Sequence, residues 1–323
     1  MSKRLSTVCV LLSFLLMTTV GVAKHFADQA LSWSFAPPEL ITSEAQSASF
    51  ETVFDYSAGE GIAHSAAIRM KQDAVGILWF DGSREGAQDV VLKERDIRFK
   101  EGAWIVGDVG VLTNRRALTQ HMDPPQAVLK LGNTIQFGES TDKLLATVVS
   151  LGGWAAASIA MVDTAEGEER VHKLPLSPFI NRSHLVRTPM VPYTDGSFGL
   201  PAYLELGNAF GEWVRMDSHG KVRDKRRMSQ GRFGIQPMVV PLDAQNAVAL
   251  MRNFERGGDR LIATWTTDGG QSWSPAEHLD PANPNAPVAA IRLAEGRLLM
   301  AYNDQPDQAN SLSLAISEDK GRS

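Results

Sequence analysis

The stretch that decides the fold is "TTDGGQSW", residues 266–273. It has the composition of a tight hairpin: Gly269 and Gly270 accept a positive φ, and the Asp268 carboxylate accepts backbone N–H bonds across the turn. Trp273 adds a large apolar ring that can pack against the neighbouring sheet. One carboxylate and two glycines offer too few oxygen ligands for calcium. The stretch therefore predicts a structural turn between two strands.

Turns of this kind, each followed by a short strand, recur along the chain. "SEDKGRS", residues 317–323, repeats the motif about fifty residues later, without the Trp. Apolar strand centres lie near residues 78, 146, 199, 249 and 298, a spacing of about 50 residues that is typical of four-stranded propeller blades. Helical periodicity is nearly absent from residue 60 onward. We therefore predict an all-β propeller of six blades, with five as the alternative; a β-sandwich would not explain the constant phase of the repeat.

The N-terminus has the features of a secretory signal. Lys3 and Arg4 precede an apolar run over residues 8–22, and Gly21-Val22-Ala23 offers the small residues of a cleavage site. We expect residues 1–23 to be a signal peptide and the protein to be periplasmic or secreted. An uncleaved anchor is the alternative, and only then would a membrane be a partner.

The rest of the chain is expected to be one large domain. With 43% hydrophobic residues it can bury a full core. Residues 24–59 are expected to supply a strand that closes the ring, and residues 60–323 to form the propeller, with a last blade that is short or cut off at Ser323. Cys9 is the only cysteine, so we expect neither a disulfide nor a thiol nucleophile.

The charge of the chain argues against nucleic acid as a partner. The formal net charge is −5, and removing the signal segment with Lys3 and Arg4 would move it to −7. The one basic run, residues 221–227, is interpreted as a solvated loop.

The opening stretch resembles the Asp box of sialidases, S/T-x-D-x-G-x-S/T-W. The residues that fit this pattern are Thr266, Asp268, Gly270, Ser272 and Trp273. Other segments over roughly residues 60–323 resemble the bacterial sialidase-like proteins with BNR repeats; examples are "LWFDGSREGAQDVVL" at 78–92, "LGNTIQF" at 131–137 and "GIQPMVVPL" at 234–242. The resemblance implies a sialidase-like propeller whose Asp boxes lie on the rim opposite the active site.

A sialidase uses three arginines around the substrate carboxylate, an Asp acid/base, and a Tyr nucleophile activated by a Glu. The resemblance places Arg84 and Asp89 of "DGSREGAQD" at one arginine and at the acid/base, a role that requires a raised pKa. It makes Arg252 of "LMRN" a second arginine. The alternatives are a structural ion-pair loop around Arg84, Glu85 and Asp89, and a simple pairing of Arg252 with Glu255.

Three positions depart from the sialidase pattern. His64 stands where the first arginine of the triad belongs, Gln236 where the Glu belongs, and Asn285 near the place of the Tyr. Arg260 is the only candidate for a third arginine, and it lies beside the Asp box. Because Gln is no base and Asn no nucleophile of this kind, the covalent Tyr route is not expected.

Polar residues in the matching segments still predict a sugar site. The substrate-binding candidates are His64, Arg84, Glu85, Asn133, Trp154, Arg187, Tyr203, Arg252, Asn285 and Asn303, and the catalytic candidates are Asp89, Glu205 and Gln236. Glu205 is the best spare carboxylate to act with Asp89, and Trp154 could stack on a sugar face. The alternatives are blade packing for Trp154 and Tyr203, a buried core imidazole for His64, and turn-forming roles for Asn133 and Asn303.

These observations predict a sialidase-like exo-glycoside hydrolase that acts on an acidic or modified glycan. Asp89 would be its general acid/base, and Arg252 and Arg84 would bind an anionic group. No cofactor and no metal are expected, and the partner is a carbohydrate. The alternative is a carbohydrate-binding propeller without catalysis; a propeller that binds proteins is least favoured, since the polar motifs would then share no purpose.

Overall fold

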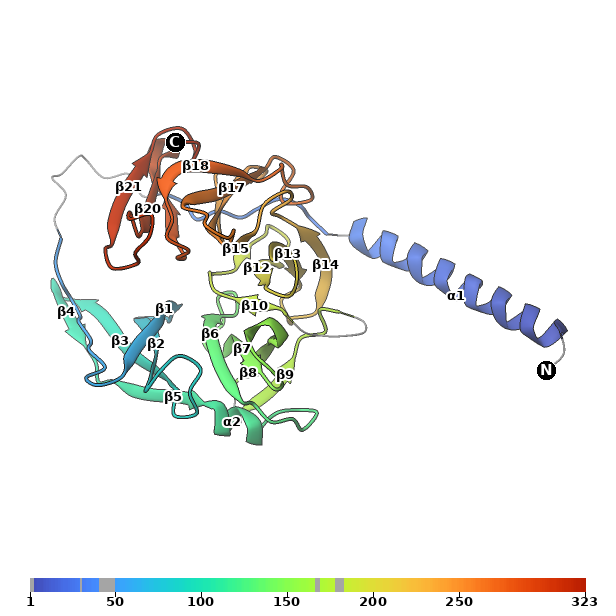
Figure 1. Cartoon of the computed structure of the whole chain (residues 1–323), viewed down its shortest axis with the longest axis horizontal. Helices are drawn as coiled ribbons and strands as arrows, with labels where there is room; N and C mark the ends of the chain where they lie inside the picture. Colours follow the sequence, from blue (N-terminus) through green and yellow to red (C-terminus); the bar gives the residue numbers. More distant parts are fainter. Residues whose placement is uncertain (1–2, 30, 41–49, 166–168, 178–182) are drawn as a thin grey trace.

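The computed structural model describes residues 3–29, 31–40, 50–165, 169–177 and 183–323. The long helix α1 (Lys3–Gln29) extends away from the rest of the molecule (Figure 1). Within the described residues, no helix has the length and apolar character needed to cross a membrane. The signal peptide over residues 1–23 stays a prediction.

From residue 62 onward the chain forms five antiparallel sheets, which are the blades of a propeller (Figure 1). Blade I contains β1 (Ile62–Met70), β2 (Val75–Gly82), β3 (Val91–Lys100), β4 (Ala103–Val106) and β5 (Gly110–Asn114). Blade II contains β6 (Lys130–Gln136), β7 (Lys143–Val149), β8 (Ser158–Asp163) and β9 (Arg170–Lys173). Blade III contains β10 (Leu185–Val186), β11 (Val191–Pro192), β12 (Phe198–Leu204), β13 (Phe210–Met216) and β14 (Val222–Arg227). Blade IV contains β15 (Gly234–Pro241), β16 (Ala247–Asn253), β17 (Arg260–Thr266) and β18 (Glu277–Ala282), and blade V contains β19 (Ala289–Arg292), β20 (Leu298–Tyr302) and β21 (Ser313–Ser317).

The all-β propeller is confirmed, and the blade number is the predicted alternative of five. The five apolar centres near residues 78, 146, 199, 249 and 298 fall in β2, β7, β12, β16 and β20. In each blade this is the strand next to the innermost one. The prediction of six blades is wrong for the described residues. Each of the five repeats seen in the sequence forms one sheet, and these residues form no sixth sheet.

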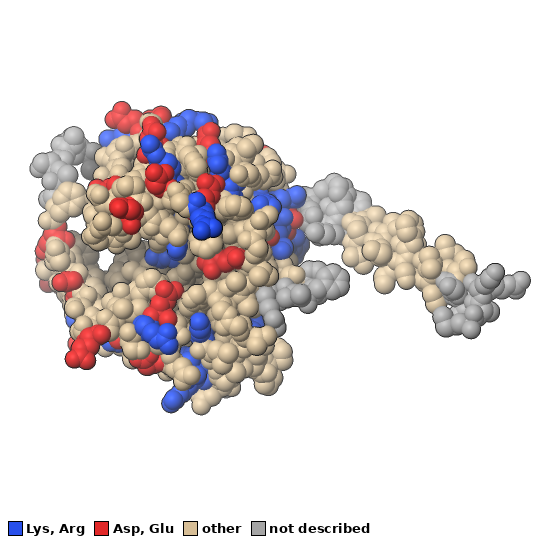
Figure 2. Space-filling model, viewed as in Figure 1, with Lys and Arg blue, Asp and Glu red and all other residues tan. Residues whose placement is uncertain are grey.

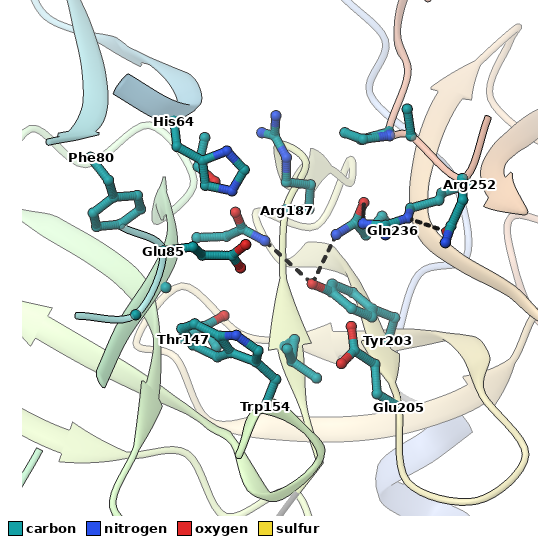
Figure 3. A pocket seen from close by; sticks show the side chains of 18 of the residues that line it. His64, Phe80, Glu85, Thr147, Trp154, Arg187, Tyr203, Glu205, Gln236 and Arg252 are labelled. Atoms are coloured by element: carbon teal, nitrogen blue, oxygen red, sulfur yellow. Dashed lines mark hydrogen bonds between the residues drawn. The ribbon is translucent and has the colours of Figure 1, made fainter. Parts of the chain in front are cut away.

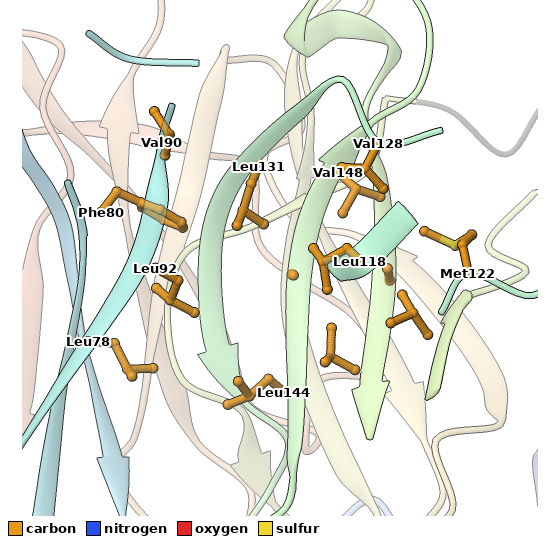
Figure 4. Close-up of a cluster of buried hydrophobic side chains, with 14 residues drawn as sticks. Leu78, Phe80, Val90, Leu92, Leu118, Met122, Val128, Leu131, Leu144 and Val148 are labelled. Carbon is orange, nitrogen blue, oxygen red and sulfur yellow. The ribbon is translucent and has the colours of Figure 1, made fainter. Parts of the chain in front are cut away.

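Apolar side chains fill the spaces between neighbouring blades. Between blades I and II, Leu78 and Leu92 on one sheet face Leu144 and Val148 on the other, and Leu118 covers the edge (Figure 4). Leu118 belongs to the short helix α2 (Arg115–Gln120), which joins the two blades. Since the core lies between neighbouring blades, no blade has a complete core of its own.

The Asp box forms the predicted hairpin between β17 and β18. The Asp268 carboxylate accepts bonds from Ser272 N at 2.9 Å and from Thr266 Oγ1 at 2.7 Å, and Gly270 N donates to Thr266 Oγ1 at 2.9 Å. Trp273 is buried and meets Trp213 with ring centroids 5.8 Å apart. The hairpin is therefore held by its own side chains and fastened to blade III.

"SEDKGRS", interpreted from the sequence as an incomplete repeat of the motif, makes similar bonds within its own turn. Gly321 N donates to Ser317 Oγ at 2.8 Å, and Ser323 N donates to the Asp319 carboxylate at 2.9 Å. Bonds from Ser323 and Ser317 lower the pKa of Asp319 to about 2.

The N-terminal segment closes no sheet in its described part. Phe35 makes a single bridge to Tyr193 of blade III, and its N–H donates to the Ala244 carbonyl of blade IV at 2.8 Å. Farther on, the Phe54 and Tyr56 rings pack in tilted contacts against Trp79 at the side of blade I. The ring-closing strand expected within 24–59 is therefore wrong for residues 31–40 and 50–59, which fasten blades from outside their sheets; residues 41–49 lie outside the described residues.

Blades I and V keep apolar side chains uncovered where the ring opens. Ile68 and Met70 of β1 are exposed, as are Ile291 of β19 and Leu314 and Ile316 of β21. Figure 2 shows the surface hollowed between these two blades, with acidic and basic side chains interspersed around it.

We expect Asp268→Ala to lower the free energy of unfolding by about 1–2 kcal/mol, because it removes a charged acceptor from three donors of the hairpin. Urea titration of both proteins measures the change. Asp280→Ala is the control: this exposed carboxylate makes a surface ion pair with Arg260, so its loss should cost about 0.5 kcal/mol or less. Equal stability of the two variants would contradict a structural role for the Asp box.

Candidate functional site

A cavity of about 540 Å³ lies where the blades converge. Eleven of the predicted site residues line it: His64, Glu85, Asn133, Trp154, Arg187, Tyr203, Glu205, Gln236, Arg252, Asn285 and Asn303 (Figure 3). They come from innermost strands, from the ends of the strands next to them, and from loops: Glu85 follows β2, Trp154 lies in a short 3-10 turn, and Asn285 precedes β19. Apolar or small residues that the sequence did not single out complete the wall; examples are Ile62, Ser65, Phe80, Thr147 and Phe254.

The cavity and the Asp box occupy opposite rims, as the resemblance implied. The start of β16 pairs with the end of β17, where Ala247 lies opposite Thr266. Arg252 lies at the other end of β16, five residues and therefore about 17 Å farther along the strand. The Asp box is thus remote from the cavity.

Asp89 and Arg84 do not line the cavity. The Asp89 carboxylate accepts bonds from Ser83 N at 2.9 Å and Ser83 Oγ at 3.0 Å. These bonds, with help from Arg84, hold the pKa of Asp89 below its ordinary value, so the raised pKa expected of an acid catalyst is wrong. The loop turns Glu85 inward instead. Sequence spacing alone did not show which carboxylate this turn directs into the ring.

Irregular strand starts bring the polar side chains to the axis. The register of the inner strand shifts between His64 and Ala67 in blade I and between Ile235 and Met238 in blade IV. Such bulges bend a strand and re-aim its side chains. Gln236 sits in the second bulge with a φ of 51°, in the left-handed region that favours glycine. Nothing in the sequence pattern predicted these bulges.

In blades II and III, too, a polar residue that lines the cavity lies at an irregularity of the inner strand. In blade II the shift lies between Leu131 and Thr134, beside Asn133. In blade III, Arg187 lies in the break between β10 and β11, two short strands that both pair with β12. The only sequence signal for this was a polar residue near the start of successive inner strands.

One hydrogen-bond network crosses the cavity floor. Asn133 Nδ2 and Gln236 Nε2 both donate to the Tyr203 hydroxyl, at 3.3 and 3.2 Å. Arg252 donates from Nη1 to Gln236 Oε1 at 3.3 Å and from Nε to Asn285 Oδ1 at 2.7 Å. Side chains from three blades and from the loop before β19 are thereby held in fixed positions.

Arg187 and Arg252 are the two cations of the cavity. Arg187 Nη1 donates to the Ala66 carbonyl at 3.0 Å, and neither guanidinium forms an ion pair with any residue the structure describes. Burial lowers the pKa of both. The expected alternative of a pair between Arg252 and Glu255 is wrong, because the Glu255 carboxylate binds Arg232 and His278. A half-buried guanidinium without a counter-ion favours an anionic ligand.

Two groups of the cavity, the Glu205 carboxyl and the Tyr203 phenol, have raised pKa values. Burial raises the pKa of Glu205, Glu85 adds to the effect and Arg252 opposes it. Burial also raises the pKa of Tyr203 to about 12, so its hydroxyl keeps its proton near neutral pH. The pKa of His64 is lowered by enclosure, opposed by Glu85 and assisted by Arg187. Its ring is therefore neutral near pH 7.

Trp154 serves both as a wall of the cavity and as packing between blades. A Cβ atom on Gly132 would lie 2.8 Å from the Trp154 ring, and one on Gly86 would lie 3.1 Å from it. The ring therefore depends on glycine in both blades I and II. Lys130 Nζ lies 5.5 Å from the ring centroid.

The sequence matches the family model of the BNR repeat-like domain over residues 74–323. The chain belongs to this family. A sequence search of curated proteins found no significant match.

Solved structures with a similar fold include two sialidases and a glycosidase. The Hadza microbial sialidase Hz136 aligns with a TM-score of 0.62 and 11% identity, over 82% of this chain and 58% of its own. The Trypanosoma rangeli sialidase in complex with the inhibitor DANA aligns at 0.55 and 12%, over 79% of this chain and 47% of its own. The GH43_1 enzyme from Xanthomonas citri aligns at 0.50 and 10%, over 80% and 91%. This BNR repeat-like chain thus has the propeller fold of glycoside hydrolases and spans about half the length of the two sialidases.

We expect Glu205→Gln to stabilise the protein at pH 7.5 but not at pH 4. The raised pKa means that the folded state binds the Glu205 proton more tightly than the unfolded state, whose pKa is near 4.5. The stability that the Glu205 proton contributes to the wild-type protein is therefore lost as pH rises from about 4.5 through the raised pKa. The Gln variant has no such proton, so its stability should not show this decrease. Thermal unfolding at both pH values measures it, with the exposed Glu318→Gln as control. A variant less stable than the wild type at pH 7.5 would contradict the burial of the carboxyl.

Proposed function

We propose that the chain is a glycoside hydrolase that acts on an acidic glycan. Arg187 and Arg252 bind the anionic group of the sugar, and Glu205 is the general acid. The observation that carries the proposal is the pair of arginines without a described counter-ion, next to a carboxyl group whose pKa is raised. The likeness of the fold to sialidases and to a GH43_1 enzyme supports it.

Glu205 and Glu85 are the two carboxyl groups available for the reaction. Figure 3 shows them on opposite sides of the Tyr203 hydroxyl, both directed toward the cavity. Glu205 donates its proton to the departing glycosidic oxygen as the bond to the anomeric carbon breaks. Water attacks that carbon, and Glu85 takes the proton that the water loses.

The proposal departs from the sialidase route at the nucleophile. Gln236 and Asn285 stand where the resemblance places the Glu and the Tyr, and Tyr203 keeps its proton because burial raises its pKa. Without a base to remove that proton, Tyr203 is a poor nucleophile. Direct attack by water is therefore the route that the residues favour.

The second candidate is a propeller that binds an acidic glycan without cleaving it. The neutral Gln236 and Asn285 favour this alternative, because a protein that only binds has no need of the Tyr–Glu pair. Arg187, Arg252 and Trp154 would then serve recognition alone.

We expect the purified protein to release product from an acidic glycoside and Glu205→Gln to lower kcat by about 100-fold or more, because the acid is lost. The substrates to screen are sialosides, uronides and acidic bacterial polysaccharides, with neutral glycosides for comparison. Arg252→Met should chiefly raise KM, because it removes a guanidinium that holds the anionic group.

Asp89→Asn is the matched control, since it changes a carboxylate outside the cavity lining. It should keep kcat within about tenfold of the wild-type value, because no general acid is removed. Loss of activity in Asp89→Asn but not in Glu205→Gln would return the acid role to Asp89. Tight binding of an acidic glycan with no product from any form would establish the second candidate.

A further inference from the structure

Arg252 fixes the orientation of the Gln236 amide. A guanidinium has only donors, so the atom of Gln236 that faces Arg252 Nη1 at 3.3 Å must be its oxygen. The nitrogen must then point to the Tyr203 hydroxyl, which it meets at 3.2 Å. Gln236 meets both partners from the bulge in β15, where its φ is 51°.

The orientation of Gln236 determines the role of Tyr203. A phenolic hydroxyl can accept two hydrogen bonds and donate one. Both acceptor positions of Tyr203 are filled, by Gln236 Nε2 and by Asn133 Nδ2 at 3.3 Å. Among the residues that the structure describes, none accepts the Tyr203 proton. That proton is left for a group in the cavity.

The same reasoning applies to Asn285 on the other side of Arg252. Its oxygen accepts the Arg252 Nε bond at 2.7 Å, so its NH2 group is turned away from Arg252. Tyr203, Arg252, Asn285 and Arg187 therefore offer hydrogen-bond donors, and two of them are charged. An ionised carboxylate accepts up to four bonds and donates none, which matches such a wall. A sugar hydroxyl would lose a partner for its own proton there.

We infer that Gln236 is a specificity-determining residue: its amide makes Tyr203 a donor, and the resulting wall selects the carboxylate of an acidic sugar over a neutral hydroxymethyl group. The inference rests on the proposed acidic substrate and identifies the part of it that is recognised. It also explains why a neutral Gln is useful at position 236. A Glu there would accept the hydrogen bond of the Tyr203 hydroxyl and would offset the positive charge of Arg252.

The test compares sugars that differ at one group. Methyl β-D-glucuronide and methyl α-D-galacturonide are paired with the corresponding methyl glucoside and galactoside, and N-acetylneuraminate is added as a third acid. Titration calorimetry gives the affinity of the full chain for each. The wild-type protein should bind at least one acid more tightly than the neutral sugars.

Tyr203→Phe should weaken binding of that acid about 10- to 100-fold, the effect of one hydrogen bond to a charged group, and leave the neutral sugars unchanged. Gln236→Glu should weaken it at least as much. Tyr193→Phe is the matched control: Tyr193 is equally buried, but its hydroxyl donates to Gly269 at the Asp-box rim, so acid binding should not change.

Two patterns would overturn the inference. If the wild type prefers the acid and Tyr203→Phe or Gln236→Glu keeps that preference, the Tyr203 proton is satisfied elsewhere, as when the Asn133 amide turns its oxygen inward; the proposed acidic substrate would then stand. If the wild type prefers no acid, the proposed function fails and the inference fails with it. A lower Tm of Tyr203→Phe without loss of the preference would show a structural role alone.

Discussion

The need to bury apolar sheet faces between neighbouring blades governs this molecule. A blade of short strands cannot cover its own two faces, and each apolar layer, such as Leu78 and Leu92 against Leu144 and Val148, is completed by a neighbouring blade. Stacking in this way brings the innermost strands together at an axis. Polar residues at the starts of those strands then meet there, although they are far apart in the sequence. The cavity is thus a consequence of how the core is made.

The two rims of the ring lie at opposite ends of the same antiparallel strands and carry different kinds of side chain. β16 carries Ala247 beside the Asp box at one end and Arg252 in the cavity at the other. At the first rim, Asp268 and Asp319 keep pKa values below their ordinary range through local hydrogen bonds, Asp268 despite the upward effect of burial. At the second rim, burial raises the pKa of Glu205. A carboxylate with a lowered pKa stabilises a turn at one rim, and a carboxyl group with a raised pKa lines the cavity at the other.

Much of the fold and the site could be predicted from the sequence because both depend on local signals. The repeat centres fell in the strand next to the innermost one in each blade. Polar residues in or beside the innermost strands, such as Asn133 and Arg187, line the cavity. Two features depended on three-dimensional geometry. The sequence did not show that Ser83 would hold Asp89 outside the cavity while Glu85 turned inward, because one bend decides this. Nor did it show that Phe35 would bridge blades III and IV instead of adding a strand.

The substitution of Gln for Glu at position 236 is best understood through the charge of the cavity. Arg187 and Arg252 supply two positive charges, and Glu85 and Glu205 are its carboxyl groups. Because burial raises the pKa of Glu205, the cavity disfavours the charged form of this carboxyl more than water does, and this leaves an excess of positive charge that attracts an anion. A third carboxylate beside Arg252 would cancel this excess. An amide at the same place accepts the Arg252 bond without adding charge and directs Tyr203 toward the ligand. Gln236, which first looks like a lost catalytic base, thus preserves the positive character that the proposed acidic sugar would require.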